Sequence, residues 1–252
     1  MRALIVDDET LARQLMIEHL SKLPQVEVIG QAANGFEAVK LAEELSPDVV
    51  FLDIQMPKLS GFEVLELLGD KVPAVVFCTA FDEFALRAFE VHAVDYLLKP
   101  VEPPRLAAAV ERVAERLANK SPPPPAQALS VSARPPGKTL ERVLIRHEGR
   151  VHVLPMERID FVEAQDDYLE FASGGKRFRK QQTMSDLESQ IDPTRFVRIH
   201  RSFIMNIERL SRIDLYGKDS WLAILSDGSK LPMSRTGHAK LKEIIGYHAA
   251  IR

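Results

Sequence analysis

The first hundred residues contain four short apolar runs, and a polar side chain directly follows each of them. The runs are residues 3–6, 49–52, 74–78 and 96–98, and the polar residues are Asp7 and Asp8, Asp53, Thr79 and Lys99. Apolar runs of this length are typical of strands in a parallel sheet that helices cover on both faces. Ligands bind such sheets at the carboxyl ends of the strands, so we expect these five side chains to converge on one site.

Three carboxylates, a hydroxyl and an ammonium group would meet at that site. Close carboxylates repel one another, and Mg²⁺ relieves the repulsion by taking oxygen ligands. Asp53 can then attack an electrophilic phosphorus, while the metal and Lys99 neutralise charge on the phosphoryl oxygens. The Thr79 hydroxyl would receive the new phosphoryl oxygen. Each of these residues alone has an alternative as a helix cap, but their shared position after regularly spaced strands favours a site.

These residues lie in motifs that resemble the receiver domain of two-component response regulators. The matching segments are residues 6–9, 51–57, 60–61, 79–80 and 95–100, and the resemblance covers about residues 1–118. It implies an α/β fold, the (βα)5 doubly wound parallel sheet of flavodoxin-like proteins. The resemblance also implies that Asp53 is the phosphoacceptor and that Thr79 and Lys99 contact the phosphoryl group. It implies that Mg²⁺ is held by Asp7, Asp8, Asp53 and the backbone carbonyl of Gln55. Thr79 and Tyr96 would form the switch.

Composition supports two soluble domains. The chain has 252 residues, 46% of them hydrophobic, which suffices for two buried cores. A run of about 18 apolar residues is absent, and the chain becomes acidic at Asp7, too early for a signal peptide. We therefore expect a cytoplasmic protein with no membrane partner. The single cysteine, Cys78, lies in an apolar run and is expected to be a buried thiol rather than a redox site.

The composition changes between residues 119 and 139. Residues 121–126 and 133–138 are rich in proline, which is typical of an extended linker. Residues 1–120 carry 12 Lys and Arg against 20 Asp and Glu, a net charge of −8. Residues 121–252 carry 21 Lys and Arg against 16 Asp and Glu, a net charge of +5, and the two parts together give −3. A basic second part suits a polyanionic partner such as nucleic acid. We predict domains at residues 1–118 and 140–252, joined by a linker at 119–139.

Short strands dominate the pattern after the linker. They are expected at residues 143–146, 151–154, 168–171, 176–180, 221–225 and 230–233, and Asp227-Gly228 predicts a hairpin turn. Two helices are expected at about residues 185–191 and 236–245, the second ended by Gly246. Because these helices are few and separated, a helix-turn-helix is excluded, and a DNA-binding domain of this kind would use loops.

The basic segment 196–206 has two interpretations from its residues alone. As a strand it would place Arg198 and His200 on one solvated face, alternating with apolar residues on the other. Alternatively, Arg201 reaches a DNA groove, where a guanidinium group pairs with guanine or with phosphate. We expect His200 to hydrogen-bond a backbone group, because it lies within an apolar segment.

This segment, together with residues 160–164 and 231–235, resembles the LytTR DNA-binding domain over about residues 140–246. The chain as a whole is similar to the LytR/AlgR class of response regulators. The resemblance implies a mostly β fold that inserts loops into DNA grooves, with Arg201 and Arg235 on contacting loops. The third loop corresponds to residues 165–168, where Asp167 could accept a hydrogen bond from cytosine although phosphate would repel it.

A second basic segment lies at residues 176–180. Its side chains Lys176, Arg177, Arg179 and Lys180 are candidates for contacts with DNA phosphates. The alternative is an edge strand that its charges protect from pairing with other strands.

Together these features predict a transcriptional regulator rather than an enzyme. A sensor histidine kinase would phosphorylate Asp53, and the protein would bind double-stranded DNA in a sequence-specific way at repeated half-sites. Phosphorylation would pair two chains through the fourth helix, near residues 82–89, the fifth strand and the fifth helix of the receiver. Two alternatives remain open: a metal-dependent phosphohydrolase with Asp7 as the nucleophile, and a C-terminal domain that binds protein or RNA under control of phosphorylation.

Overall fold

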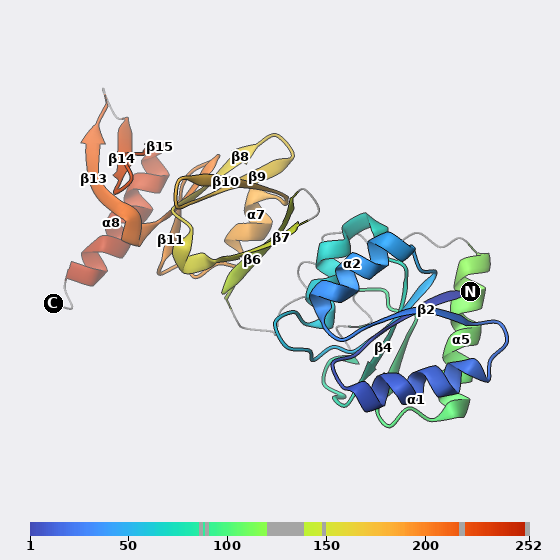
Figure 1. Ribbon diagram of the computed structural model, residues 1–252. Coiled ribbons are helices and arrows are strands. Elements are labelled where there is room, and N and C mark those ends of the chain that lie inside the picture. Colours follow the sequence, from blue (N-terminus) through green and yellow to red (C-terminus); the bar gives the residue numbers. More distant parts are fainter. Residues whose placement is uncertain (86–87, 89–90, 120–138, 148–149, 217–219, 250–252) are drawn as a thin grey trace. The chain divides into compact units, whose positions relative to one another are not determined.

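The chain forms two compact units, Met1–Pro136 and Gly137–Arg252, in the computed structural model shown in Figure 1. The structure describes residues 1–85, 88, 91–119, 139–147, 150–216 and 220–249. The predicted linker at 119–139 lies outside these residues except for its two ends, so the predicted domain bounds stay a prediction.

The N-terminal unit is a parallel sheet with helices on both faces. Its strands are β1 (Arg2–Val6), β2 (Glu27–Ala32), β3 (Val49–Leu52), β4 (Ala74–Thr79) and β5 (Asp95–Leu98), arranged in the order β2-β1-β3-β4-β5. Its helices are α1 (Thr10–Ser21), α2 (Gly35–Leu45), α3 (Gly61–Leu68) and α5 (Pro103–Ala118), with a short 3-10 turn η1 (Gly69–Lys71) after α3. Helix α1 contacts α5, and α2 contacts α3. The predicted doubly wound α/β fold is confirmed.

Burial explains why the apolar runs form the central strands. Every residue of β3 and β4 is buried, and alternate side chains enter opposite cores. One core joins Ile5, Phe51 and Val76 to Leu106 and Val110 of α5. Burial on both faces requires a continuous apolar sequence rather than an alternating one. The helix expected near residues 82–89 falls partly outside the described residues.

Local sequence signals set where α2 and α3 begin. The Asn34 side chain accepts a hydrogen bond from the Glu37 amide at the start of α2. Ser60 and Glu63 form a reciprocal capping box at the start of α3, which satisfies backbone N–H groups that have no partner within the helix. A Cβ atom at Gly61 would lie 2.4 Å from the Asp53 carbonyl oxygen, so glycine permits α3 to start against the end of β3.

The C-terminal unit is mostly β structure, as predicted. Its strands are β6 (Arg142–His147), β7 (Arg150–Pro155), β8 (Phe161–Gln165), β9 (Tyr168–Ser173), β10 (Lys176–Gln181), β11 (Phe196–His200), β12 (Phe203–Asn206), β13 (Leu210–Leu215), β14 (Trp221–Leu225) and β15 (Lys230–Met233). They form sheets in the orders β10-β9-β8-β12-β11, β13-β14-β15 and β6-β7. The helices are α7 (Met184–Glu188) and α8 (Arg235–Ala249), and 3-10 turns lie at η2 (Met156–Arg158) and η3 (Ile207–Arg209).

The larger sheet of this unit is buried on both faces. One face packs Phe171 and Ile204 against Leu187 of α7, and the other packs Met205 against Leu231 and Leu241. Asn206 ends β12 fully buried, and both polar atoms of its side chain are used. Its amide donates to the Ile159 carbonyl at 2.9 Å and its oxygen accepts from the Glu208 amide at 3.0 Å. Asn206 therefore ties two connecting segments to the end of β12 without an unpaired polar group.

Helix α8 packs very closely against β11. A Cβ atom on Gly237 would lie 2.0 Å from the carbonyl oxygen of Ile199. The indole ring of Trp221 stacks on His238, with ring centroids 4.2 Å apart. The expectation that Gly246 ends this helix is wrong, since α8 continues to Ala249. Gly246 does not adopt the left-handed conformation of a terminating glycine, and a helix tolerates an interior glycine at a cost of about 1 kcal/mol.

The close approach of α8 to β11 gives a test of the fold. We expect Gly237→Ala to lower the free energy of unfolding of the C-terminal unit by about 3 kcal/mol, because the methyl group would overlap the β11 backbone. Gly246→Ala on the same helix is the matched control, since no atom lies within 4 Å of its Cβ position. It should raise stability by about 0.5–1 kcal/mol. Urea unfolding followed by fluorescence of Trp221, the single tryptophan of the chain, measures both, and equal stability of the two variants would contradict the packing.

Candidate functional site

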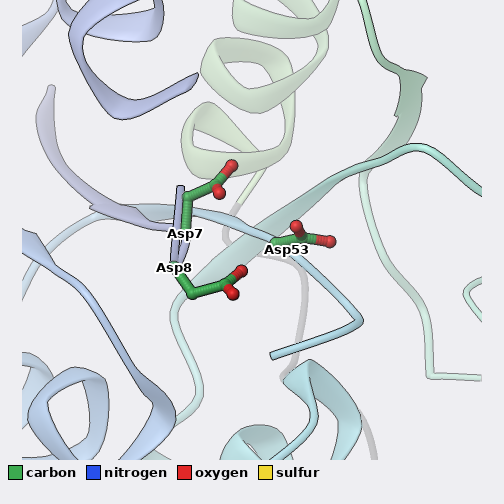
Figure 2. Close-up of side chains that lie close together, drawn as sticks. All are labelled: Asp7, Asp8 and Asp53. Atoms are coloured by element: carbon green, nitrogen blue, oxygen red, sulfur yellow. The ribbon is translucent and has the colours of Figure 1, made fainter. Parts of the chain in front are cut away.

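Three carboxylates meet at the carboxyl ends of β1 and β3, as Figure 2 shows. Asp7, Asp8 and Asp53 each offer an oxygen atom, and these atoms lie within 4.8 Å of one another. Asp7 and Asp53 are each only 5% exposed, whereas Asp8 is exposed. Like charges this close disfavour joint ionisation unless a cation lies between them.

Lys99 supplies one such cation. It follows β5, and its Nζ atom lies 2.7 Å from Asp7 Oδ2 and 2.7 Å from Asp53 Oδ2. Burial lowers the pKa of Lys99, but its hydrogen bonds to Asp53 and Asp7 outweigh burial and hold the pKa above its ordinary value. The ammonium group therefore stays charged and links the ends of three strands.

Asp7 keeps a net cost of burial despite this partner. Burial raises its pKa above the ordinary value of 3.8, and the hydrogen bonds from Lys99 and from the Glu9 amide offset the shift only in part. The Glu9 amide donates to Asp7 Oδ1 at 3.0 Å. Three carboxylates thus share this site with the single ammonium group of Lys99.

Asp53 presents its carboxylate between two donors. Lys99 binds Oδ2, and the Gln55 amide donates to Oδ1 at 3.2 Å. The backbone N–H of Asp53 donates to the Val6 carbonyl at 2.8 Å, which fixes the end of β3 beside β1. The expected role of the Gln55 carbonyl as a metal ligand stays a prediction.

Thr79 ends β4 with a fully buried side chain. Its hydroxyl has no hydrogen-bond partner among the residues that the structure describes. Its carbonyl accepts from the Lys99 amide at 2.8 Å, so the two residues lie on adjacent strand ends. A buried hydroxyl without a partner is costly, so the Thr79 hydroxyl is available to donate to an acceptor that enters the site.

Cys78 precedes Thr79 and is buried, as expected. Burial raises the pKa of its thiol, so the unreactive protonated form persists at neutral pH.

Tyr96 connects β5 to the loop after Thr79. Its hydroxyl donates to the Phe81 carbonyl, two residues beyond Thr79, and its ring lies 6.5 Å from that of Phe77. Burial, with the nearby charge of Asp82, raises the pKa of Tyr96 to about 12, so the hydroxyl remains a donor. Sequence reasoning did not find Phe81, although its short distance from Thr79 along the chain was a usable signal.

In the C-terminal unit, the three loops predicted to contact DNA lie side by side. The Ala164 amide donates to the Ser202 carbonyl at 2.9 Å, which places the β8–β9 turn beside the β11–β12 turn. The Ser234 amide donates to the Ile199 carbonyl at 2.8 Å, which places the start of α8 beside the end of β11. The exposed side chains of these loops include Asp167, Arg201 and Arg235.

A basic pocket opens between the end of β11 and the start of α8. Its volume is about 370 Å³, and its lining residues are Arg198, His200, Arg201, Ser234, Thr236 and Lys240. His200 accepts a hydrogen bond from the Ser202 amide at 3.2 Å, as expected for a residue that satisfies the backbone. Sequence reasoning missed Thr236 and Lys240, because the pocket joins segments that are about 40 residues apart in the chain.

Two of the basic residues of β10, Arg177 and Arg179, have carboxylate partners within the unit. Arg177 lies 3.6 Å from Glu163 and 3.5 Å from Glu170, and its guanidinium group covers the Phe161 ring. Arg179 bonds Glu170 at 3.0 Å. Strand β10 lies at the edge of its sheet, so these pairs fit a charge-protected edge. The phosphate contacts expected of Lys176, Arg177, Arg179 and Lys180 stay a prediction.

Among the described residues, no helix combines the length and the apolar character that crossing a membrane requires.

Comparison with known proteins identifies both units. Residues 3–111 match the response regulator receiver domain, and residues 149–246 match the LytTr DNA-binding domain. The transcriptional regulatory protein BtsR of Salmonella typhi is 37% identical over 248 residues, which is 97% of this chain and 99% of that protein. The sensory transduction protein LytT of Enterococcus faecalis is 33% identical over 248 residues, which is 98% of this chain and 99% of that protein.

One solved structure, the response regulatory domain of protein mrkE from Klebsiella pneumoniae, is 31% identical. It covers 47% of this chain and 99% of its own, with a TM-score of 0.44. The full-length relatives and the two matched domains agree with the acidic site of the first unit and the basic loops of the second. The chain belongs to the two-component response regulators that join a receiver domain to a LytTr DNA-binding domain.

Proposed function

We propose that this protein is a cytoplasmic transcriptional regulator that accepts a phosphoryl group on Asp53 from a sensor histidine kinase. The observation that carries this proposal is the grouping of Asp53, Lys99 and Thr79 at three strand ends. A nucleophilic carboxylate, a charged ammonium and a buried hydroxyl without a partner supply the attacking atom and two of the groups that a transferred phosphoryl needs.

The donor set of the acidic cluster fits Mg²⁺. Hard carboxylate oxygens from Asp7, Asp8 and Asp53 lie close together, and Mg²⁺ prefers oxygen ligands. We assign the ion to these residues and to the Gln55 carbonyl. When bound, Mg²⁺ supplies positive charge to the phosphoryl oxygens.

The transfer itself uses the chain's own groups. An Asp53 carboxylate oxygen attacks phosphorus and forms an O–P bond, while the N–P bond to the kinase histidine breaks and its electron pair returns to the imidazole. Lys99 neutralises phosphoryl charge, and the Thr79 hydroxyl donates to a phosphoryl oxygen. The product is a phosphoprotein, so the domain serves as an acceptor and not as an enzyme that turns over a substrate.

Tyr96 couples phosphorylation of Asp53 to the loop that follows Thr79. Its hydroxyl holds the Phe81 carbonyl, so a movement of Thr79 toward the phosphoryl group pulls on the loop that this hydrogen bond anchors. We place the homodimer surface beyond this loop, on residues 82–89, β5 and α5. The side chain of Leu98 on β5 is 50% exposed, which suits an apolar contact between two chains.

Pairing brings two DNA-binding domains onto repeated half-sites. In each domain, Arg201 and Arg235 reach base edges in the grooves, where a guanidinium group reads guanine. Asp167 on the neighbouring turn accepts from a cytosine amino group. The LytTr match and the adjacency of the three exposed loops support this assignment.

The phosphoacceptor can be tested chemically. Incubation with acetyl phosphate and Mg²⁺ should give an alkali-labile adduct, and Asp53→Asn should abolish it, because an amide is not a nucleophile. Asp82→Asn, an exposed aspartate of the same domain, is the control and should keep the adduct. Intact-protein mass spectrometry measures the added mass. Persistence of the adduct in Asp53→Asn would rule out Asp53 as the sole acceptor.

The cost of burying Asp7 predicts a dependence of stability on pH. Above pH 3.8, the ordinary pKa, the folded state holds a proton on Asp7 that the unfolded chain has lost. The free energy of unfolding of the metal-free protein therefore falls as the pH rises from there to the raised pKa. Asp7→Asn removes this contribution, so its stability relative to wild type should rise with pH.

Urea unfolding in the presence of a chelator, followed by circular dichroism, measures the difference in unfolding free energy between Asp7→Asn and wild type. Trp221 fluorescence reports unfolding of the C-terminal unit, so its transition can be distinguished from that of the N-terminal unit. The exposed Asp82→Asn variant should track wild type at every pH. Mg²⁺ should stabilise wild type more than Asp7→Asn, because it relieves the repulsion at this site. A stability difference between Asp7→Asn and wild type that is constant with pH would contradict the stated cost of burial.

Sequence reading by Arg235 can be tested after selection of duplexes from a random DNA pool. Arg235→Ala should weaken binding to the selected duplex by about 1–3 kcal/mol and weaken binding to scrambled DNA less. Arg179→Ala, whose arginine already pairs with Glu170, is the control and should have a smaller effect that is equal on both duplexes. Anisotropy titrations at fixed salt measure the affinities of wild type and of both variants for both duplexes. An equal loss for Arg235→Ala on both duplexes would reassign it to a phosphate.

A further inference from the structure

The pocket between β11 and α8 has the composition of an anion site. Arg198, Arg201 and Lys240 carry positive charge, His200 lies beside them, and no carboxylate belongs to its lining. Its volume of about 370 Å³ is several times that of a water molecule, about 30 Å³. The pocket is therefore open to a ligand as large as a phosphate group.

The start of α8 adds neutral donors to these charges. Ser234 caps the helix: its hydroxyl accepts from the Gly237 amide at 3.0 Å and lies 3.1 Å from the Ile199 carbonyl. The Thr236 hydroxyl lies 3.1 Å from Ser234 Oγ at the pocket surface, where it can turn toward a ligand. Backbone N–H groups in the first turn of a helix also favour an anion.

A carboxylate outside the lining already binds two of the pocket's cations. Glu188, the last residue of α7, accepts from Arg198 Nη1 at 2.9 Å. Its other oxygen lies 3.6 Å from Lys240 Nζ. A second hydrogen bond, from Arg198 Nη2 to the Arg201 carbonyl at 3.0 Å, holds the guanidinium group at the pocket wall. Glu188 thus contacts Arg198 and Lys240 as an incoming anionic oxygen would.

We propose that this pocket binds one backbone phosphate of the DNA, and that Glu188 competes with that phosphate for Arg198 and Lys240. The inference rests on the proposed DNA-binding function and specifies a contact within it. Arg201 lines the pocket and also belongs to the loop that we assign to a DNA groove. A phosphate bound in the pocket would therefore flank the base that this loop reads. Competition from Glu188 lowers affinity for DNA of every sequence and so leaves discrimination to the base contacts.

The first test removes one pocket cation from the full-length protein. Lys240→Gln should weaken binding to the selected and to the scrambled duplex alike. It should also lower the slope of log affinity against log salt by about 0.9, the loss of one phosphate contact. Lys242→Gln removes an equal charge two residues along the same helix, outside the pocket, and should leave the slope closer to wild type. Equal slopes for Lys240→Gln and Lys242→Gln would overturn the pocket assignment.

The second test removes the competing carboxylate, which should raise the affinity for DNA, whereas loss of a pocket cation lowers it. Glu188→Gln frees Arg198 and Lys240, so affinity for both duplexes should rise. Glu157→Gln, an exposed glutamate of the same unit outside the pocket, controls for the added net charge and should raise affinity less. An affinity of Glu188→Gln no higher than that of Glu157→Gln would overturn the competition. Thermal unfolding followed by Trp221 fluorescence verifies that each variant is folded.

A third test locates the phosphate on the DNA. Uncharged methylphosphonate groups are placed one at a time along the selected duplex, and affinities are measured for wild type and Lys240→Gln. One position in each half-site should weaken wild type and have a smaller effect on Lys240→Gln, a coupling that a free phosphate ion in the pocket would not produce. Absence of any coupled position would overturn the proposal. Failure of wild type to bind any duplex would instead overturn the proposed DNA-binding function.

Discussion

The receiver site depends on one ammonium group shared by two buried carboxylates. Lys99 lies at equal distance from Asp7 and Asp53, and without it two adjacent negative charges would be buried together. These two ion pairs link the ends of β1, β3 and β5. The site therefore forms only when the sheet brings these three strand ends together. Lys99 neutralises only one of the three carboxylate charges of the site. A divalent ion suits the site because it would neutralise the charge that remains.

The same sheet places an unsatisfied donor next to this charge. Thr79 keeps a buried hydroxyl without a partner among the described residues, while nearly all buried polar groups in proteins are paired. The adjacent Tyr96 hydrogen bond to the Phe81 carbonyl then connects the site to the outer face of β5. In the proposed function, this hydroxyl and the Tyr96 hydrogen bond form the two ends of one switch.

The sequence predicts much of this, and the reasons differ between the units. Apolar runs that end in Asp53 or Thr79 reveal a parallel sheet and its site together, because the ends of parallel strands must converge. In the C-terminal unit, strands such as β9, β10, β14 and β15 were predicted, but β8 and β13 were not, and neither was the contact between Lys240 and Glu188. Their meeting with Arg198 depends on how α7 and α8 pack on β11, which no local pattern encodes. Gly246 was misjudged because an exposed helix position tolerates glycine at a small cost, so the residue type alone does not end the helix.

The fit of Gly237 against the Ile199 carbonyl has a further consequence for how this protein's binding preference can change. Backbone lies against backbone at that point, so any side chain at residue 237 would push the start of α8 away from β11. With Arg201 and Arg235 assigned to base edges as proposed, a new operator preference then comes from exchange of these two side chains, one base position at a time, rather than from movement of the helix.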